Sequence, residues 1–414
     1  MIGSHSASSP VPAFDPWSTE FIAWPYDVYA QLRDEYPVWF FERTGQYLLS
    51  RYADVNALLR DRRLGRTYLH VATHEEMGHE PDPDYLAPFW KLIRDGMLDR
   101  EPPDHTRLRR LVSKAFTPRM VEQLRPRIAA IADQLVDRLV DAGSDGSPVD
   151  LISVVAEPLP VTVIAEMLGV PEADRHLLRP WSAQIVGMYE LNPSPEAERI
   201  AVRACEEFSA YLRGLARARR ERPGDDLISA LAGVLDQGDR LTEDELIGTC
   251  VLLLNAGHEA TVNVTGNGWW ALFRNPGELA RLRAEPGLLP TAIEELMRYD
   301  TPLQMFERWV LEDIEVHGVR IPRGTEVGLL FGSANHDPAV FANPTALDLG
   351  RRANPHVSFG AGIHFCLGAP LARVELMTSF GTLLRRVPAL AVAAEPTWGA
   401  GYIVRGLTEL KVTT

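Results

Sequence analysis

The chain has 414 residues and carries 42 Lys and Arg against 56 Asp and Glu, which gives a formal net charge of −14 at pH 7. Such an acidic chain lacks the basic surface that nucleic-acid binding requires, so we expect no nucleic-acid partner. Its three cysteines are too few and too scattered for a disulfide framework, which favours a reducing compartment. No apolar run is long enough to span a membrane and no signal peptide is recognisable, so the sequence predicts a cytoplasmic protein with no membrane partner.

The N-terminal part begins with a segment of low apolar content. Residues 1–12 are rich in Ser and Pro and predict a disordered arm, followed by one domain over residues 13–414. Two strands are expected at Val38–Phe41 and Tyr47–Ser50, joined by a turn. From Tyr52 to about Asp300 the pattern is mostly helical, divided by Pro and Gly stop signals.

The C-terminal part has shorter elements. Beyond Pro302 the pattern predicts strands and loops, with Val316–Val319 and Glu326–Leu330 as candidate strands. A final helix is expected from about Gly368 to Arg386, and strands and turns again from Leu390 onward.

One predicted helix is unusually long. It begins at the capping box Thr242-Glu243-Asp244-Glu245 and ends at Asn275-Pro276, about 30 residues or roughly 45 Å. In its middle lies Ala256-Gly257-His258-Glu259-Ala260-Thr261, where small residues let another group approach the backbone closely. From the residues alone, that group is either a tightly packed second helix or a ligand.

The strongest chemical signal is the segment Phe359–Gly368, in which three glycines surround Cys366 just before the final helix. Glycine allows tight turns and close approach of the backbone to a flat ligand. Backbone N–H groups at a junction of loop and helix can donate to a thiolate and stabilise its anionic form. The alternative, a buried inert cysteine, is the usual role of a lone cysteine but does not explain this spacing.

This segment, continued by Ala369-Pro370-Leu371-Ala372-Arg373-Val374-Glu375, resembles the F-G-x-G-x-H-x-C-x-G loop of the cytochrome P-450 family of haem-thiolate monooxygenases. The resemblance implies a mainly α fold with a small β-rich portion, a helical triangular prism that holds haem b between the long helix and the cysteine loop. It makes Cys366 the axial ligand of the iron, because a thiolate favours O–O cleavage. It also gives further cofactor contacts to these residues: Phe359 beside the sulfur, His364 on a haem propionate, and Gly360, Gly368, Ala256 and Gly257.

Other family motifs follow in order along the chain. Glu295-Leu296-Met297-Arg298 looks like the E-x-x-R pair, whose i,i+3 spacing puts both charges on one helix face. The resemblance adds Arg351 as the third member of a buried structural triad. His105 and Arg109 share a helix face, and with Arg308 they match family positions that bind the haem propionates. Without the other motifs, the most common role for each of these charged residues is that of a solvated surface charge.

The long helix departs from the family at one catalytic position. Family members commonly carry A-G-x-[DE]-T, and this chain keeps the acid as Glu259 but has Ala260 where a threonine helps to deliver protons. Three alternatives explain the missing hydroxyl. The first is that a substrate hydroxyl or an ordered water takes the place of the threonine, and the second is that a helical bulge brings Thr261 to that position. The third is that the reaction needs no oxygen insertion, as in oxidative coupling. The first alternative is favoured. The arginine–proline pair of peroxide-using relatives is absent from this helix, which disfavours peroxygenase chemistry.

The sequence holds no fused flavin or iron–sulfur domain, so the resemblance implies ferredoxin and ferredoxin reductase as separate electron donors. We expect an acidic ferredoxin to dock on one basic helix. The residues expected to supply its charge are Arg107, Arg109, Arg110, Lys114 and Arg119.

The implied reaction uses dioxygen and two electrons to hydroxylate or otherwise oxidise a small hydrophobic substrate, in bacterial secondary metabolism or in steroid or xenobiotic oxidation. An apolar pocket suits such a ligand. Its expected wall includes Met97, Met188, Met305 and Tyr402, with Tyr189 and Phe306 beside them. A haem-thiolate binding protein without turnover is the competing class, and the complete haem motifs with Glu259 retained favour the enzyme.

Overall fold

The computed structural model describes residues 13–236 and 238–414, so the arm expected at 1–12 lies outside the described residues. Within the described part of the chain, no helix is both long enough and apolar enough to cross a membrane. The α-helices are α1 Thr19–Ala23, α2 Tyr26–Glu35, α3 Tyr52–Leu58, α4 Ala87–Asp95, α5 Asp104–Ala115, α6 Pro118–Ala142, α7 Pro158–Leu168, α8 Leu178–Val186, α9 Pro195–Glu221, α10 Leu227–Gly233, α11 Glu243–Arg274, α12 Pro276–Ala284, α13 Leu289–Tyr299, α14 Phe331–Ala334 and α15 Ala369–Arg386.

The strands are short and lie mainly at the two ends of the chain. They are β1 Val38–Phe41, β2 Gln46–Leu49, β3 Leu64–Gly65, β4 Val149–Asp150, β5 Met305–Val310, β6 Ile314–Val316, β7 Val319–Ile321, β8 Glu326–Leu330, β9 Ala391–Val392, β10 Thr397–Trp398, β11 Leu407–Glu409 and β12 Lys411–Thr413. The expected fold class, mainly helical with a small β-rich portion, is confirmed.

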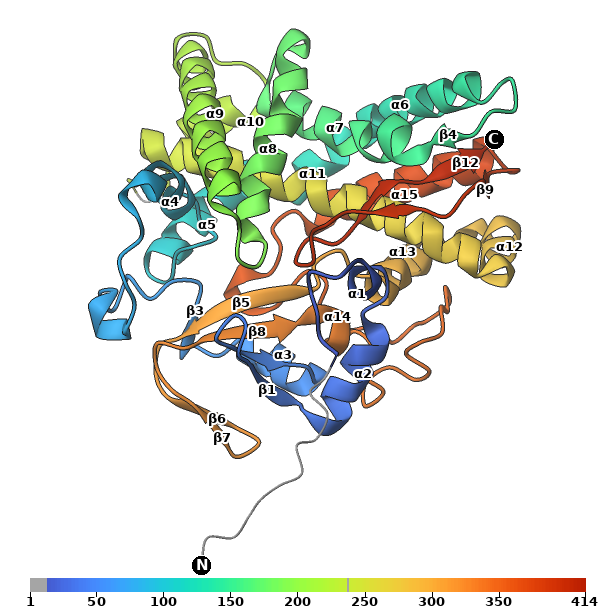
Figure 1. Cartoon of the computed structure of the whole chain (residues 1–414). Coiled ribbons are helices and arrows are strands. Elements are labelled where there is room, and N and C mark those ends of the chain that lie inside the picture. The colour runs from blue at the N-terminus through green and yellow to red at the C-terminus, as the bar shows by residue number, and fades with distance from the viewer. Residues whose placement is uncertain (1–12, 237) are drawn as a thin grey trace, which may run out of the picture.

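Helix α11 crosses the molecule between a group of helices, α6 to α10, and the five-stranded sheet (Figure 1). Its 32 residues are buried over most of their length. Both halves of the predicted capping box are formed: Glu245 N donates to Thr242 Oγ1 at 3.2 Å, and Thr242 N donates to Glu245 Oε2 at 2.9 Å. A helix with apolar and small residues on all sides must be covered on all sides, which puts α11 at the centre.

The largest sheet has the strand order β1-β2-β8-β5-β3. Strand β5 pairs with β8 in antiparallel register, with Phe306 opposite Leu329 and Arg308 opposite Val327. Side chains alternate between the two faces of a strand, so Phe306 and Arg308 share one face of β5 while Met305 and Glu307 share the other.

One expected strand is wrong. Val316–Val319 spans the turn of a hairpin, in which β6 and β7 pair as Val316 opposite Val319. His317 and Gly318 adopt φ values of 50° and 78°, the left-handed conformation that a two-residue hairpin turn requires.

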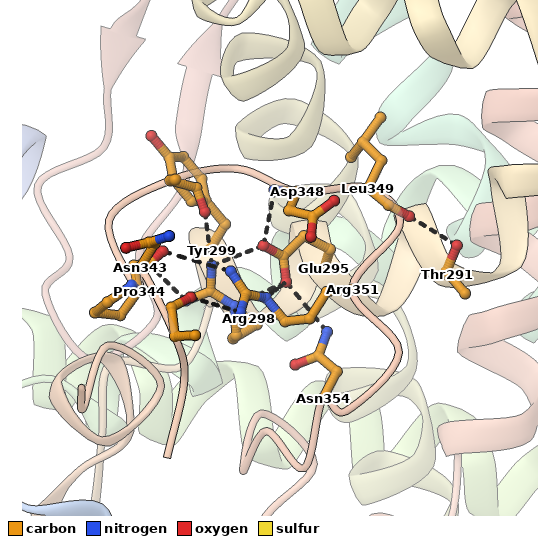
Figure 2. A network of polar contacts seen from close by, with 12 residues as sticks. Thr291, Glu295, Arg298, Tyr299, Asn343, Pro344, Asp348, Leu349, Arg351 and Asn354 are labelled. Carbon is orange, nitrogen blue, oxygen red and sulfur yellow. Dashed lines mark hydrogen bonds and ion pairs between the residues drawn. The ribbon is translucent and has the colours of Figure 1, made fainter. Parts of the chain in front are cut away.

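The predicted triad fastens α13 to the segment 343–354 (Figure 2). Arg298 donates to both oxygens of Glu295 at 2.8 Å, and Arg351 Nε donates to Glu295 Oε2 at 2.9 Å. Glu295 and Arg298 are completely buried. Arg298 also donates to the carbonyls of Asn335 and Pro344, so this geometry joins a helix to the loop that leads to the cysteine segment.

Candidate active site

The main cavity of the molecule, about 310 Å³, lies between α11 and the cysteine loop. Residues of α11 and of the cysteine loop form most of its wall, and side chains from α7, β5 and α15 complete it. The sequence-predicted site residues that line it are Met97, His105, Arg109, Ala256, Gly257, Glu259, Ala260, Thr261, Arg308, Phe359, Gly360, His364, Cys366 and Gly368. Residues from four distant stretches of sequence therefore meet at one cavity.

Cys366 lies between a short 3₁₀ turn, Gly362–His364, and the first turn of α15. Burial raises the pKa of its thiol, while N–H groups of Gly368 and Ala369 and the guanidinium of Arg109 act in the opposite direction. The loop bends sharply at Gly362, where φ is 70° and a Cβ would lie 2.4 Å from the carbonyl oxygen of Leu59. The thiol thus faces N–H donors at a helix start, a setting that stabilises a thiolate.

The small residues of α11 border the cavity, and the packing of α7 on α11 does not require a glycine at position 257. A Cβ on Gly257 would lie 3.6 Å from Ile164, an ordinary contact. By contrast, a Cβ on Gly248 would lie 2.7 Å from the backbone nitrogen of Gly96, so the close approach of α11 to another segment occurs there. Of the two alternatives left open for Gly257, the structure favours a ligand.

The polar groups around the cavity fit a ligand that carries carboxylates. Neither ring nitrogen of the buried His105 has a hydrogen-bond partner among the residues described, and burial lowers its pKa to about 4. Burial lowers the pKa of Arg308 to about 9, and its Nη1 donates to the carbonyl of Glu307 at 2.8 Å. Arg109 Nη2 lies 2.5 Å from the carbonyl of Phe365. Cys366 with these donors suits haem, whose iron accepts a thiolate and whose propionates accept from Arg and His.

The acid of α11 is held by its neighbour. Glu259 Oε1 lies 3.1 Å from Nε2 of His258. The His258 side chain is almost completely buried, and its other ring nitrogen, Nδ1, lies 3.4 Å from the Ser182 hydroxyl. Burial by itself would raise the pKa of Glu259, but the contact with His258 has the larger effect. The net result is a pKa below the ordinary value of a glutamate. Glu259 therefore lines the cavity as a carboxylate.

Thr261 does not replace Ala260. Helix α11 stays α-helical from Glu243 to Arg274, without the bulge that would bring Thr261 into register with position 260. The Thr261 hydroxyl lies 3.4 Å from the carbonyl of Gly257 and also hydrogen-bonds Glu375 of α15. The bulge hypothesis is therefore wrong for this structure.

Glu375 is a cavity residue to which sequence reasoning gave no role. Burial raises the pKa of its carboxyl to about 8, and Oε2 has no partner within the described part of the chain. The only signal in the sequence was an acid among the apolar residues of the helix that follows Cys366. Burying an acid is costly, so an acid at such a position suggests a functional role.

Three expected pocket residues do not line the cavity. Met305 is fully buried on the other face of β5, where it packs with Leu48 and Leu330. In the 3₁₀ turn Gly187–Tyr189, residues three apart share a face, so Val186 and Tyr189 reach the cavity and Met188 does not. The hydroxyl of Tyr402 lies 2.9 Å from that of Tyr29, in the core around α2.

The expected basic surface on α5 is largely neutralised. Arg107 pairs with Asp239 and Glu245, and both Arg110 and Lys114 pair with Asp236. Three cations thus face three carboxylates from the segment that precedes and begins α11. The positive charge expected on this helix is thus offset at Arg107, Arg110 and Lys114 by carboxylates more than 100 positions away, which no local pattern shows.

Comparison with known proteins agrees with this site. The family model described as "Cytochrome P450" matches residues 69–388. The chain is 39% identical over 413 residues to "Polyketide biosynthesis cytochrome P450 PksS" of Bacillus subtilis, covering 97% of this chain and 98% of the relative. It is 39% identical over 415 residues to "Cytochrome P450 monooxygenase PikC" of Streptomyces venezuelae, covering 98% and 95%.

Solved structures show the same fold. A structure of P450BioI in complex with acyl carrier protein ligated to hexadec-9Z-enoic acid superposes with a TM-score of 0.87 at 38% identity, covering 96% of this chain and 100% of that chain. By fold, family model and sequence identity, the chain belongs to the bacterial cytochrome P450 monooxygenases, an oxidoreductase family that works with a haem-iron cofactor.

Proposed function

We propose that residues 13–414 form one domain that binds haem b and hydroxylates a hydrophobic small molecule with dioxygen and two electrons. The single observation that supports this most is the main cavity, where Cys366 faces the small residues Ala256 and Gly257 of α11. Electrons come from separate ferredoxin and ferredoxin reductase proteins in this proposal.

The residues present fit the cofactor. Cys366 holds the iron through its sulfur, and the propionates bind to His105, Arg109, Arg308 and His364. His364 Nε2 lies 3.2 Å from Glu101 Oε1, which fixes the imidazole ring. Bound haem supplies iron-centred activation of dioxygen, for which a thiolate is the suitable ligand.

Protons reach the cavity without a hydroxyl at position 260. Glu259 lies at the cavity wall as a carboxylate, 3.1 Å from His258, and relays protons without storing one. Glu375 keeps a proton at neutral pH because burial raises its pKa to about 8. Its carboxyl group contacts Thr261, and its Oε2 atom has no hydrogen-bond partner among the described residues. Ordered water or a substrate hydroxyl then links these acids to the reacting oxygen.

The substrate is a hydrophobic secondary metabolite in this proposal. The cavity wall is mostly aliphatic and aromatic, with Phe306, Leu252 and Ile164 among its members. A relative whose name includes polyketide biosynthesis, and a neighbour solved with an acyl chain on its carrier protein, agree with a long apolar ligand.

The experiment is a reduced carbon monoxide difference spectrum of the purified chain reconstituted with haem b. We expect the strongly red-shifted Soret band of a thiolate complex, which Cys366→Ser should remove. Cys205→Ser is the control, because Cys205 is also a free cysteine but is buried in α9 and does not line the cavity. Retention of the red-shifted band in Cys366→Ser would contradict the assignment.

Proton delivery is tested with Ala260→Thr. We expect the restored hydroxyl to raise the yield of product per reduced nicotinamide consumed for substrates without a nearby hydroxyl, and to change it little for others. If the yield stays the same for every substrate, assistance by water or substrate is not needed at this position.

A further inference from the structure

A small side pocket lies against the main cavity, between the end of α4 and the first half of α11. It shares Leu98, Tyr189, Leu252 and Asn255 with the main cavity, so the two spaces adjoin. Its volume is about 10 Å³, roughly that needed for the centre of one water molecule or one hydroxyl oxygen.

Two polar side chains of this side pocket lack partners for one oxygen each. Asn255 is 5% exposed and Asp99 is 9% exposed, so both are at least nine-tenths buried. Arg66 Nη2 donates to Asp99 Oδ1 at 2.8 Å and fixes the carboxylate. Asp99 Oδ2 and Asn255 Oδ1 accept no hydrogen bond from any residue that the structure describes.

The unpartnered atoms define the chemistry of the missing group. Both are acceptors, so the group that satisfies them must be a hydrogen-bond donor. A buried acceptor without a partner costs free energy, which a donor on a ligand would recover. Because Arg66 already balances the charge of Asp99, a neutral donor such as a hydroxyl fits better than an ammonium group.

Tyr189 forms a third polar side of the pocket. Burial raises the pKa of its phenol, and the nearby Asp99 adds to that effect, so the ring stays neutral at physiological pH. Asn255 directly precedes Ala256, and position 260 lies about 7 Å further along the helix axis. A group held at Asn255 thus lies about 7 Å along the helix axis from Ala260, in the adjoining space.

We propose that Asp99 and Asn255 form a polar subsite that binds a hydroxyl group of the substrate, so that the enzyme selects hydrophobic molecules that already carry one. This inference rests on the proposed monooxygenase function, whose substrate class it narrows. It implies that a preceding reaction, such as a ketone reduction or an earlier hydroxylation, supplies the substrate.

The test compares dodecan-1-ol with 1-methoxydodecane, which has the same chain but cannot donate a hydrogen bond. Binding to the haem-loaded full chain is measured by the change of haem spin state and, independently of haem, by equilibrium dialysis. We expect the wild type to bind the alcohol about tenfold more tightly than the ether. Asn255→Leu removes an acceptor and should bring this ratio close to one, whereas Asp99→Asn keeps one acceptor oxygen and should only lower the ratio.

Asp95→Asn is the matched control, since Asp95 ends α4 and pairs with Lys91 outside both cavities. It should keep the wild-type ratio. Asp99→Asn disturbs a buried ion pair and can unfold the chain, whereas Asn255→Leu replaces an unpartnered acceptor with an apolar group of similar shape. We therefore expect the unfolding midpoint of Asn255→Leu to be no lower than that of the wild type.

The two proposals fail in different ways. Normal thiolate spectra with equal binding of alcohol and ether by the wild type would overturn the subsite alone. A preference for the alcohol that persists in Asn255→Leu would also overturn it. Absence of haem binding would overturn the proposed function, while dialysis would still show whether the alcohol is preferred.

Discussion

At the scale of single residues, the polar groups of the triad and those of the cavity differ in how many hydrogen-bond partners they have. Those of the triad are saturated, since Glu295 accepts from Arg298, Arg351 and the backbone of Asp348 (Figure 2). Those around the cavity are not, since His105 and Glu375 keep atoms without partners among the described residues. A buried polar group without a partner is costly, and beside a cavity a ligand can supply that partner. His105 and Glu375 therefore suit ligand binding, whereas the saturated network of the triad indicates a structural role.

Glu295→Gln should strongly destabilise the protein. The substitution removes a negative charge that balances two buried guanidinium groups, and breaking a buried pair in this way costs about 3–5 kcal/mol. Urea unfolding followed by circular dichroism measures the change. Glu122→Gln, which breaks an exposed pair with Arg125, should cost less than about 1 kcal/mol. Similar losses in the two variants would show that the triad is not a structural centre.

Glu375 should make stability depend on pH. Its folded pKa of about 8 exceeds that of an unfolded glutamate, so the folded state binds the proton more tightly. The stabilisation this gives is complete below about pH 4.5 and is lost as pH rises through about 8. Glu375→Gln, which cannot ionise, should therefore gain stability relative to the wild type between pH 5 and pH 9. Urea unfolding across this range measures it, and a constant difference would contradict the raised pKa.

At the scale of elements, the sequence predicted most of the structural features that depend on neighbouring residues. The capping box of α11, the i,i+3 pair of α13 and the glycine turns beside Cys366 all depend on neighbours within a few residues, and all were found. Two failures were local, at the hairpin turn His317-Gly318 and the 3₁₀ turn Gly187–Tyr189, and the others depend on distant partners. Asp236 faces Arg110 across more than 120 positions, and which face of β5 meets the cavity follows from the sheet order, not from the strand itself.

Two glycines of α11 should respond oppositely to alanine. A Cβ at Gly248 would lie 2.7 Å from backbone of Gly96, so Gly248→Ala forces α11 away from the end of α4 and should cost about 1–3 kcal/mol. Gly257→Ala meets only Ile164 at 3.6 Å and removes a flexible residue from a helix, so the haem-free protein should gain up to about 1 kcal/mol.

Thermal unfolding of the haem-free variants gives both values, and their haem content gives a second readout. Gly257→Ala should retain less haem than the wild type, because its methyl group occupies the cavity face of α11. Full haem retention in that variant would show that close approach at Gly257 is not required.

At the scale of the whole molecule, two segments far apart in sequence meet beside the cavity. The turn after α8 and the C-terminal loop approach one another (Figure 1). Glu190 Oε2 accepts from the N–H groups of Tyr402 and Ile403 at 2.8 and 2.9 Å, and Oε1 accepts from Val404 at 2.9 Å. Since Tyr189 and Val404 both line the cavity, this single carboxylate fastens one wall to the other.

Glu190→Ala should therefore change how fast ligands enter and leave more than how tightly they bind. Three hydrogen bonds to a carboxylate are lost together, and none of them is a contact with the ligand, so association and dissociation rates should both rise about tenfold. Stopped-flow measurement of the ligand-induced spin change gives both rates. Glu196→Ala, an exposed acid in the first turn of α9, should leave them unchanged. A rise in the dissociation rate alone would mean that Glu190 shapes the pocket and does not hold the segments together.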